Sequence, residues 1–233
     1  MTHIVKTEEI YFNFYKVPRL SLKMSDEGGA FGLDIHHALE ACYLIDLYNC
    51  DVIIETGTHT GDTTEFLAKM FPSLKILTCD IETAYLNIAC KRLEPYKNIE
   101  MYLESSEKFL KKYLKKFTFP FIFLDAHWNN YWPLSDELCI IKKGVVCIDD
   151  YDINYEGFDF DEYKNIKCNE KLVKEAVGKD TCIFSNNPHA EYAFPCMQKK
   201  RRSGRGYFQL GKNNNHFLKN NMFKIEGSHY AKK

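Results

Sequence analysis

The chain has 233 residues, of which 45% are hydrophobic and 27% are charged, and its formal net charge is -1. A chain of this length can bury the core of one sizeable domain, and this composition excludes a disordered protein. The near-zero net charge gives no general attraction to nucleic acid or to an anionic membrane. We therefore expect a small molecule as the partner, with neither nucleic acid nor a membrane involved.

The chain carries no signal for export or for membrane insertion. The longest apolar run, Phe119 to Leu124, is too short to cross a bilayer, and Met1 to Lys6 lack the apolar core of a signal peptide. The nine cysteines include no Cys-x-x-Cys pair, and several lie inside apolar segments, as is usual in a reducing compartment. We expect a cytoplasmic protein with neither disulfides nor zinc.

Residues 1–33 are rich in aromatic side chains and end in the tract Gly28 to Gly32. They are expected to form an arm packed on the domain or, alternatively, a lid that closes on substrate, because glycine tracts occur in both. From Asp34, a residue that suits an N-cap, apolar residues recur at helical spacing as far as Ile45. This pattern predicts the first helix of a domain that spans residues 34–211.

The stretch from Asp51 to Asp62 predicts the ligand site. Val52 to Ile54 favour a buried parallel strand, and Gly57 and Gly61 allow the sharp turn into the next helix. A dinucleotide would place its pyrophosphate on this turn, where the carboxylate of Glu55 would repel it. S-adenosylmethionine instead carries an ammonium and a sulfonium, which an acid attracts. We therefore predict a methyl-donor site, the alternative being an ordinary strand-to-helix turn.

The second predicted strand, Lys75 to Asp80, also ends in an acid. About 20 residues beyond the first motif, such an acid accepts hydrogen bonds from the ribose of a bound nucleoside; alternatively, Asp80 caps the following helix. The third strand, Ile99 to Leu103, precedes Ser105 and Ser106, which can meet an adenine edge or merely cap the next helix. The lysines of that helix are expected to form a solvated face.

Two further strands, 119–124 and 145–148, also end in polar side chains: Asp125 and His127 follow the first, and Asp149 and Asp150 follow the second. The carboxyl ends of parallel strands meet at one edge of a sheet. These groups are therefore expected to converge on one crevice with Glu55 and Asp80.

Three carboxylates in that crevice predict a metal ion. Like charges raise one another's pKa and oppose folding, so they need a compensating cation. Oxygen ligands suit Mg²⁺, and the absence of paired thiolates argues against zinc. We predict Asp125, Asp149 and Asp150 as the metal ligands; alternatively, they cap helices or hold His127 by a hydrogen bond.

A hydroxyl bound to such a cation has a lowered pKa and can attack the sulfonium methyl in line. The residues predicted to take part in catalysis are Asp125, His127 and Asp149. His127 is expected to act as a general base or a further ligand, or alternatively only as a positional hydrogen-bond partner. Trp128, Tyr131 and Trp132 are expected either to wall the acceptor site or to pack in the core.

The remaining segments surround this site. The loop 151–169 is long and irregular, which is typical of functional loops. Thr181 to Phe184 and Tyr207 to Leu210 are predicted as strands, the latter as an edge or antiparallel strand. The basic run Lys199 to Arg202 is expected to be a solvated loop. The tail 212–233 is expected to be peripheral.

These residues resemble those of class I S-adenosylmethionine-dependent methyltransferases. Glu55-Thr56-Gly57-x-x-x-Gly61 matches their first motif, and Asp80 matches the acid of their second. Three further segments are more narrowly similar to the macrocin O-methyltransferase and cephalosporin-hydroxylase-associated group, and more distantly to catechol-type O-methyltransferases. These segments are Leu124-Asp125-Ala126-His127-Trp128, Pro133-Leu134-x-x-Glu137-Leu138 and Ile148-Asp149-Asp150. The resemblance covers residues 34–210.

The resemblance implies an α/β fold with a doubly wound, Rossmann-like sheet of seven strands. Their implied order is 3-2-1-4-5-7-6, with strand seven antiparallel and helices on both faces. The donor site would contain Glu55, Gly57, Thr58, Gly61, Asp80, Ser105, Ser106 and Asp125, and the metal would be held by Asp125, Asp149 and Asp150. Thr58 and His59 stand where glycine is frequent in the family, so the pose of the donor is not fixed.

Three hypotheses follow. The first is a metal-assisted O-methyltransferase that acts on a small hydroxylated molecule, such as a sugar or a natural-product precursor. The second is an NAD(P)- or nucleotide-sugar-binding Rossmann enzyme, against which Glu55 and the missing third glycine count. The third is a non-catalytic binding protein on the same fold. A homo-oligomer is left open.

Overall fold

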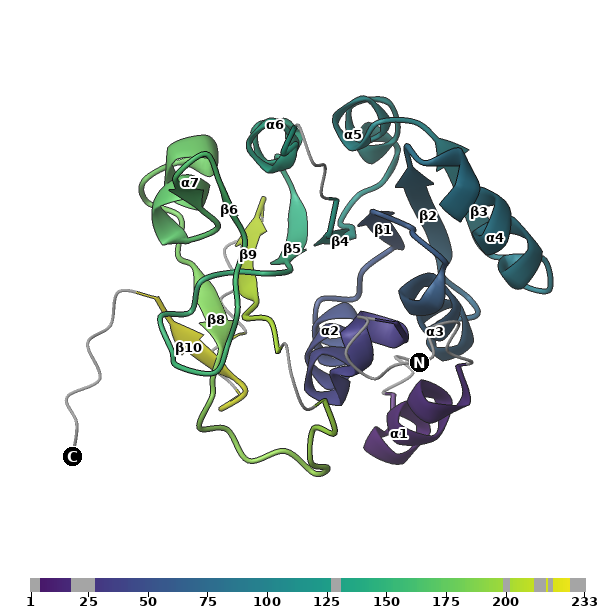
Figure 1. Cartoon of the computed structure of the whole chain (residues 1–233), viewed down its shortest axis with the longest axis horizontal. Coiled ribbons are helices and arrows are strands. Elements are labelled where there is room, and N and C mark those ends of the chain that lie inside the picture. The colour runs from purple at the N-terminus through teal and green to yellow at the C-terminus, as the bar shows by residue number, and fades with distance from the viewer. Residues whose placement is uncertain are drawn as a thin grey trace.

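A computed structural model of the chain describes residues 5–17, 28–126, 131–198, 202–211, 217 and 220–226. A central, mostly parallel sheet carries α1, α2 and α3 on one face and α5, α6 and α7 on the other (Figure 1). The helices are α1 (Thr7–Lys16), α2 (Ile35–Leu47), α3 (Asp62–Met70), α4 (Thr83–Leu93), α5 (Ser106–Tyr113), α6 (Leu134–Ile140) and α7 (Glu170–Val177), with short 3-10 turns η1 (Ala30–Leu33) and η2 (Leu114–Lys116).

The sheet order is β10-β8-β9-β5-β4-β1-β2-β3. Its strands are β1 (Val52–Thr56), β2 (Lys75–Asp80), β3 (Ile99–Leu103), β4 (Phe121–Leu124), β5 (Gly144–Ile148), β8 (Phe184–Asn186), β9 (Gly206–Leu210) and β10 (Phe223–Ile225). The order that the resemblance implies for seven strands is confirmed for β1 to β5, β8 and β9. The last of these in the chain, β9, runs antiparallel to both β5 and β8. In α/β sheets of this kind, ligands bind at the carboxyl ends of the parallel strands.

The predicted count of seven strands is wrong, because β10 pairs antiparallel with β8 and becomes the eighth strand. The tail around it is polar, and only Phe223 and Ile225 alternate, which is too short a pattern to predict a strand. Phe223 is buried against Tyr207 and Phe217, so long-range packing rather than local sequence places this strand.

The sixth strand begins at Phe184, whereas Thr181 to Phe184 was predicted. Its polar residues Ser185 and Asn186 are buried and make hydrogen bonds, with Glu226 and with the backbone N–H of Arg205. Buried polar side chains that find partners are favourable in a strand, although they hide its apolar pattern. The loop 151–169 also holds a small two-stranded sheet, β6 (Glu162–Tyr163) with β7 (Ile166–Lys167).

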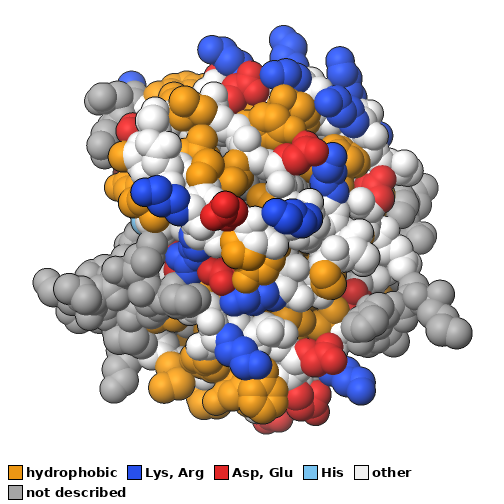
Figure 2. Space-filling model, turned by 90° about the vertical axis from the view of Figure 1, so that its right-hand side faces the viewer, with side chains coloured by type: hydrophobic (Ala, Val, Ile, Leu, Met, Phe, Trp, Pro, Cys, Tyr) orange, Lys and Arg blue, Asp and Glu red, His pale blue; other side chains and the backbone are white. Residues whose placement is uncertain are grey.

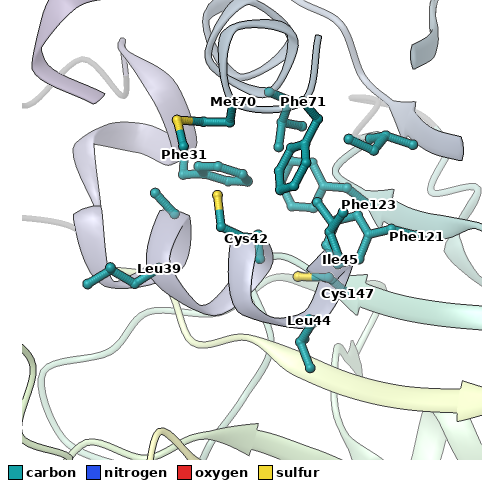
Figure 3. Packing of buried hydrophobic residues seen from close by; sticks show 14 of the residues in the cluster. Phe31, Leu39, Cys42, Leu44, Ile45, Met70, Phe71, Phe121, Phe123 and Cys147 are labelled. Carbon is teal, nitrogen blue, oxygen red and sulfur yellow. The ribbon is translucent and has the colours of Figure 1, made fainter. Parts of the chain in front are cut away.

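Strands β1, β4 and β5 are buried on both faces. Because side chains alternate along a strand, Phe121, Phe123 and Cys147 pack under α2 and α3, whereas Ile122 and Leu124 pack under α5 and α6. Figure 3 shows the first of these clusters, where helix residues such as Cys42 meet the strand residues. The sheet centre is therefore a rigid base for the loops at its carboxyl edge.

The predicted N-cap of α2 is confirmed, because the Asp34 carboxylate accepts a hydrogen bond from the backbone N–H of His36 at 2.9 Å. The Asn169 side chain caps α7, which the sequence analysis did not predict. At the N-terminus, α1 packs on α2 and α3 through buried Ile10 and Phe14. Residues 18–27, which belong to the predicted arm or lid, lie outside the described residues.

The β3 edge of the sheet, with α4 beside it, faces the viewer in Figure 2. Basic, acidic and apolar side chains are interspersed there. The lysines of α5 and η2 from Lys111 to Lys116 are exposed, as expected for a solvated face. No helix among the described residues is long and apolar enough to cross a membrane.

An ion-pair network with a buried centre joins α2 to the residue before β9. The guanidinium of Arg205, of which 1% is exposed, lies 2.9 Å from Asp34 Oδ2 and 2.9 Å from Glu40 Oε2. Arg202 is a second cation on Asp34, at 3.2 Å. The hydroxyls of Tyr192 and Tyr207 donate hydrogen bonds to Glu40. Two cations therefore face two carboxylates.

The stability of this network requires that every buried charge keeps its partner. A buried ion pair adds little net stability, but removing one partner leaves an uncompensated charge in the core. Because Arg205 directly precedes β9 and Asp34 is the N-cap residue of α2, the network also fixes the segment 202–206 against the first turn of α2.

We expect Arg205→Met to lower the free energy of unfolding by about 3–5 kcal/mol, because Glu40 and Asp34 would lose their buried cation. The matched control is Arg202→Met, which removes the partly exposed cation and should cost no more than about 1 kcal/mol. Urea unfolding of the two variants measures the difference. Equal losses would show that the buried position of Arg205 is not what matters.

Candidate active site

A cavity of about 1290 Å³ opens at the carboxyl ends of β1, β2, β4 and β5. It brings together the predicted residues Glu55, Gly57, Thr58, Asp80, Ser105, Asp125, Asp149 and Asp150. Gly61 and Ser106 do not line it. His127 and Trp128 lie outside the described residues. The predicted convergence of the strand-end acids on one crevice is therefore observed.

The loop after β1 approaches β4 very closely at Gly57. This glycine has φ 86°, and a Cβ built on it would lie 2.3 Å from the carbonyl oxygen of Asp125. The backbone N–H groups of Gly57 and Thr58 donate to the carbonyl of Cys79 on β2, at 2.9 and 3.0 Å. Only glycine fits this contact without displacing the backbone of Asp125.

Gly61 has a different task. It is the N-cap residue of α3 with φ 79°, and the space beside it is filled by Leu93 and Ala89 of α4. Gly61 therefore allows α3 to pack closely on α4, and it does not line the cavity.

Glu55 is almost fully buried below the loop. Its Oε2 accepts hydrogen bonds from the hydroxyls of Thr64 on α3 at 2.5 Å and Thr78 on β2 at 2.7 Å, and Thr78 in turn contacts Thr58 Oγ1 at 2.6 Å. Burial raises the pKa of Glu55 to about 8, against the lowering effect of these hydrogen bonds. At neutral pH this group is therefore mostly protonated, whereas the sequence suggested a carboxylate.

Asp80 holds two turns of backbone at the cavity rim. Its carboxylate accepts from the N–H of His59 at 2.7 Å and from that of Glu82 at 2.8 Å. Glu82, not Asp80, is the N-cap residue of α4, so Asp80 shapes the entry to the helix instead of capping it. The exposed side chains of Ile81 and Tyr85 line the same end of the cavity.

At the next strand end, Ser105 is the N-cap residue of α5 but makes no capping hydrogen bond with its side chain. Its hydroxyl instead donates to Glu107 Oε1 at 2.6 Å. The Ser106 hydroxyl is buried without a hydrogen-bond partner. Ser105 and Glu107 line the cavity together with Lys108.

The opposite end of the cavity is acidic. Burial raises the pKa of Asp149 well above its usual range, and the neighbouring charges of Asp125 and Asp150 raise it further. Asp149 Oδ1 has no hydrogen-bond partner, and His37 Nδ1 lies 3.9 Å from it. Asp150, with φ 50°, accepts a hydrogen bond from the Ser203 hydroxyl.

Among the described residues, no three histidine, cysteine or acidic side chains stand close enough together to hold a metal ion as they are arranged. Tyr131 lines the cavity, whereas Trp132 packs on the cluster of side chains under α5 to α7.

The sequence did not single out several residues that line the cavity. These residues are Phe31, His37, Gln198, Ser203 and Arg205. They reach the cavity through the N-terminal segment and the segment that leads into β9, which are distant in the chain from the strand-end acids. Arg202 likewise pairs with Asp34 and lies over the ring of Phe158, so it is not the solvated loop residue that was predicted. Residues 199–201 lie outside the described residues.

The parallel order β3-β2-β1-β4-β5, the antiparallel β9 and the glycine loop after β1 together define the fold of class I methyltransferases. Solved structures share this fold. The O-methyltransferase TomG from Streptomyces achromogenes has 16% identity and a TM-score of 0.52, with 89% of this chain and 97% of TomG covered. An O-methyltransferase from Bacillus cereus has 15% identity and a TM-score of 0.51, with coverage of 88% and 90%. The methyltransferase domain of bacterial CtHen1 has 14% identity and a TM-score of 0.51, with coverage of 76% and 100%.

The sequence model of the O-methyltransferase family matches residues 26–176, which is more than half of the chain. The chain belongs to this family, and its enzyme class is that of the S-adenosylmethionine-dependent methyltransferases. No curated protein sequence matches the chain. The narrower similarity to the macrocin group stays a prediction.

We expect Gly57→Ala to destabilise the chain and to weaken donor binding, because the new Cβ would collide with the carbonyl of Asp125. Gly157→Ala is the matched control, since Gly157 also has a positive φ (91°) but has nothing within 4 Å of the new Cβ. Both variants carry the conformational cost of about 1 kcal/mol or slightly more. Thermal unfolding and calorimetric titration with S-adenosylhomocysteine should show a clearly larger loss for Gly57→Ala; equal losses would contradict the close contact.

The raised pKa of Glu55 makes a second prediction. Between the ordinary pKa of 4.5 and about 8, the unfolded chain loses this proton while the folded chain keeps it, so folding stability falls as the pH rises through this window. Glu55→Gln retains an oxygen acceptor but cannot ionise. We expect the variant to lose this part of the pH dependence and to be more stable than the parent at pH 8 by up to a few kcal/mol, since one pKa unit corresponds to about 1.4 kcal/mol. Urea unfolding from pH 5 to 8.5 measures this, and parallel curves for the two proteins would refute it.

Proposed function

We propose that the chain transfers the methyl group of S-adenosylmethionine to a hydroxyl oxygen of a small molecule with the help of a divalent cation. One observation carries the proposal. The glycine loop and Asp80 follow β1 and β2 on one side of a single cavity, and Asp125, Asp149 and Asp150 follow β4 and β5 on the other, with Gly57 and Asp125 in contact where the two sides meet. A donor on the first end would direct its methyl group towards the second.

The donor end suits S-adenosylmethionine. Gly57 carries no side chain, the Thr58 hydroxyl is turned to Thr78, and the Asp80 carboxylate is a suitable acceptor for ribose hydroxyls. Glu55 lies beneath the loop and would favour its ionised form when the cationic methionine part is bound. TomG is solved in complex with S-adenosylmethionine and the Bacillus cereus enzyme in complex with S-adenosylhomocysteine, which supports the same donor here.

The acidic end fits a divalent cation by its chemistry. Asp149 carries a buried oxygen without a partner, and its pKa is raised in part by Asp125 and Asp150. These three carboxylates would hold the ion, with Asp150 exchanging its hydrogen bond with Ser203 for a metal bond. The ion, when bound, would lower the pKa of the acceptor hydroxyl. Asp125 and Asp149 would then orient the hydroxyl towards the donor.

A small neutral or hydroxylated acceptor suits this end better than a nucleic acid. Asp125, Asp149, Asp150 and Asp161 all line it, and their charges would repel a phosphate backbone.

The nine cysteines are all free thiols, which supports the inference that the protein works in the cytoplasm.

Calorimetry with S-adenosylhomocysteine, with and without MgCl₂, tests the donor and the metal separately, and NAD serves as the competing ligand. We expect S-adenosylhomocysteine to bind and NAD not to bind. Transfer of labelled methyl from S-adenosylmethionine to a panel of catechols and sugars, in MgCl₂ or in EDTA, tests the reaction. Binding of NAD without binding of S-adenosylhomocysteine would overturn the proposal in favour of the dinucleotide alternative.

The two ends of the cavity should separate by mutation. We expect Asp149→Asn to lower methyl transfer by about 10- to 100-fold or more while the affinity for S-adenosylhomocysteine stays within about threefold. We expect Asp80→Asn to weaken that affinity by about tenfold, or 1.4 kcal/mol. Single-turnover transfer and calorimetry measure these effects, and loss of donor binding in Asp149→Asn would contradict this division.

A further inference from the structure

His37 links the core to the acidic end of the cavity. It lies in the first turn of α2 with 1% of its surface exposed, and its ring packs between Phe31 and Phe123, at centroid distances of 4.3 and 5.2 Å. Its Nε2 lies 3.2 Å from the Cys147 sulfur on β5, and its Nδ1 lies 3.9 Å from Asp149 Oδ1. The two ring nitrogens therefore face two residues at the end of the same strand.

The two contacts favour one tautomer of the neutral ring. If the proton is on Nδ1, the Cys147 thiol can donate to Nε2 and the Nδ1–H points towards the unpartnered oxygen of Asp149. If the proton is on Nε2, a lone pair of the ring faces the lone pairs of the carboxylate. For an ionised Asp149, only the first arrangement gives the buried oxygen a donor.

We propose that His37 is a positioning residue that donates its Nδ1–H to Asp149 and thereby fixes the orientation of this carboxylate in the acceptor site. The inference rests on the proposed function of Asp149 as a ligand. The 3.9 Å between His37 Nδ1 and Asp149 Oδ1 is longer than a hydrogen bond, so the carboxylate would have to rotate towards the ring for the bond to form. Histidine suits this task because it has two ring nitrogens. The contact of Nε2 with the Cys147 sulfur orients the ring, so that Nδ1 faces Asp149.

Asparagine and glutamine distinguish positioning from packing. The amide nitrogen of asparagine can take the place of Nδ1, whereas that of glutamine extends towards the place of Nε2. Both substitutions remove the ring from the contacts with Phe31 and Phe123, so a purely structural role would affect both alike. His36→Gln is the neighbouring control, because His36 contacts Phe194 and Arg202 and does not line the cavity.

The experiment measures the Mg²⁺ affinity of the full chain saturated with S-adenosylhomocysteine, by calorimetry, together with the melting temperature. We expect His37→Gln to weaken Mg²⁺ binding by about tenfold or more. We expect His37→Asn to weaken it by no more than about threefold and His36→Gln to leave it unchanged. Equal weakening in the two His37 variants overturns the proposal.

A nitrogen-15 correlation spectrum of the wild-type chain gives a second readout that needs no variant of His37. We expect the His37 ring to carry its proton on Nδ1, with a shifted Nδ1 resonance in Asp149→Asn. A proton on Nε2 overturns the proposal whether or not Mg²⁺ binds. If the wild-type chain binds no Mg²⁺ but shows the Nδ1–H tautomer and the Asp149-dependent shift, the metal part of the proposed function fails while the role of His37 stands.

Discussion

The buried pairing of Arg205 with Asp34 and Glu40 is the constraint on which the site depends. It joins the first turn of α2 to the segment before β9, although these lie far apart in the chain. The same turn of α2 carries His37, and the same segment carries Ser203. The network therefore positions His37 next to Asp149 and Ser203 next to Asp150. Charges in a core must be matched, and matching them here fixes the walls of the acidic end of the cavity.

The two ends of the cavity are joined by the contact between Gly57 and the carbonyl of Asp125. Strands β1 and β4 are neighbours in register, and the loop of one lies directly on the end of the other. The backbone that would receive the donor therefore cannot move without moving the residue that faces the acceptor. Transfer between two bound molecules requires such fixed separation, because small errors in position reduce the rate strongly. The rigid sheet centre beneath these loops serves the same end.

Local sequence patterns predicted the strands and the acids at their ends, because buried parallel strands are continuously apolar and end abruptly at polar residues. The order of the strands came instead from the resemblance to class I methyltransferases, since no local pattern fixes which strands pair. The chain's eighth strand was missed because Phe223 and Ile225 alternate over too few residues. The partners of Glu40 and Asp149 were missed for a different reason: Arg205 and His37 lie more than a hundred positions away, and no local pattern marks such a pair. The charge of Glu55 was misjudged because its burial between Thr64 and Thr78 arises only from the packing of α3 on the sheet.

Protonated Glu55 has a consequence for the pH at which a positively charged group can bind above it. With its proton in place, the floor of the glycine loop is a hydrogen-bonded carboxylic acid that adds no negative charge to the cavity. A cationic ligand on this loop would favour the ionised form and would therefore displace the proton into solvent. Uptake of the ligand and release of a proton would then be linked, and the affinity would rise as the pH approaches 8.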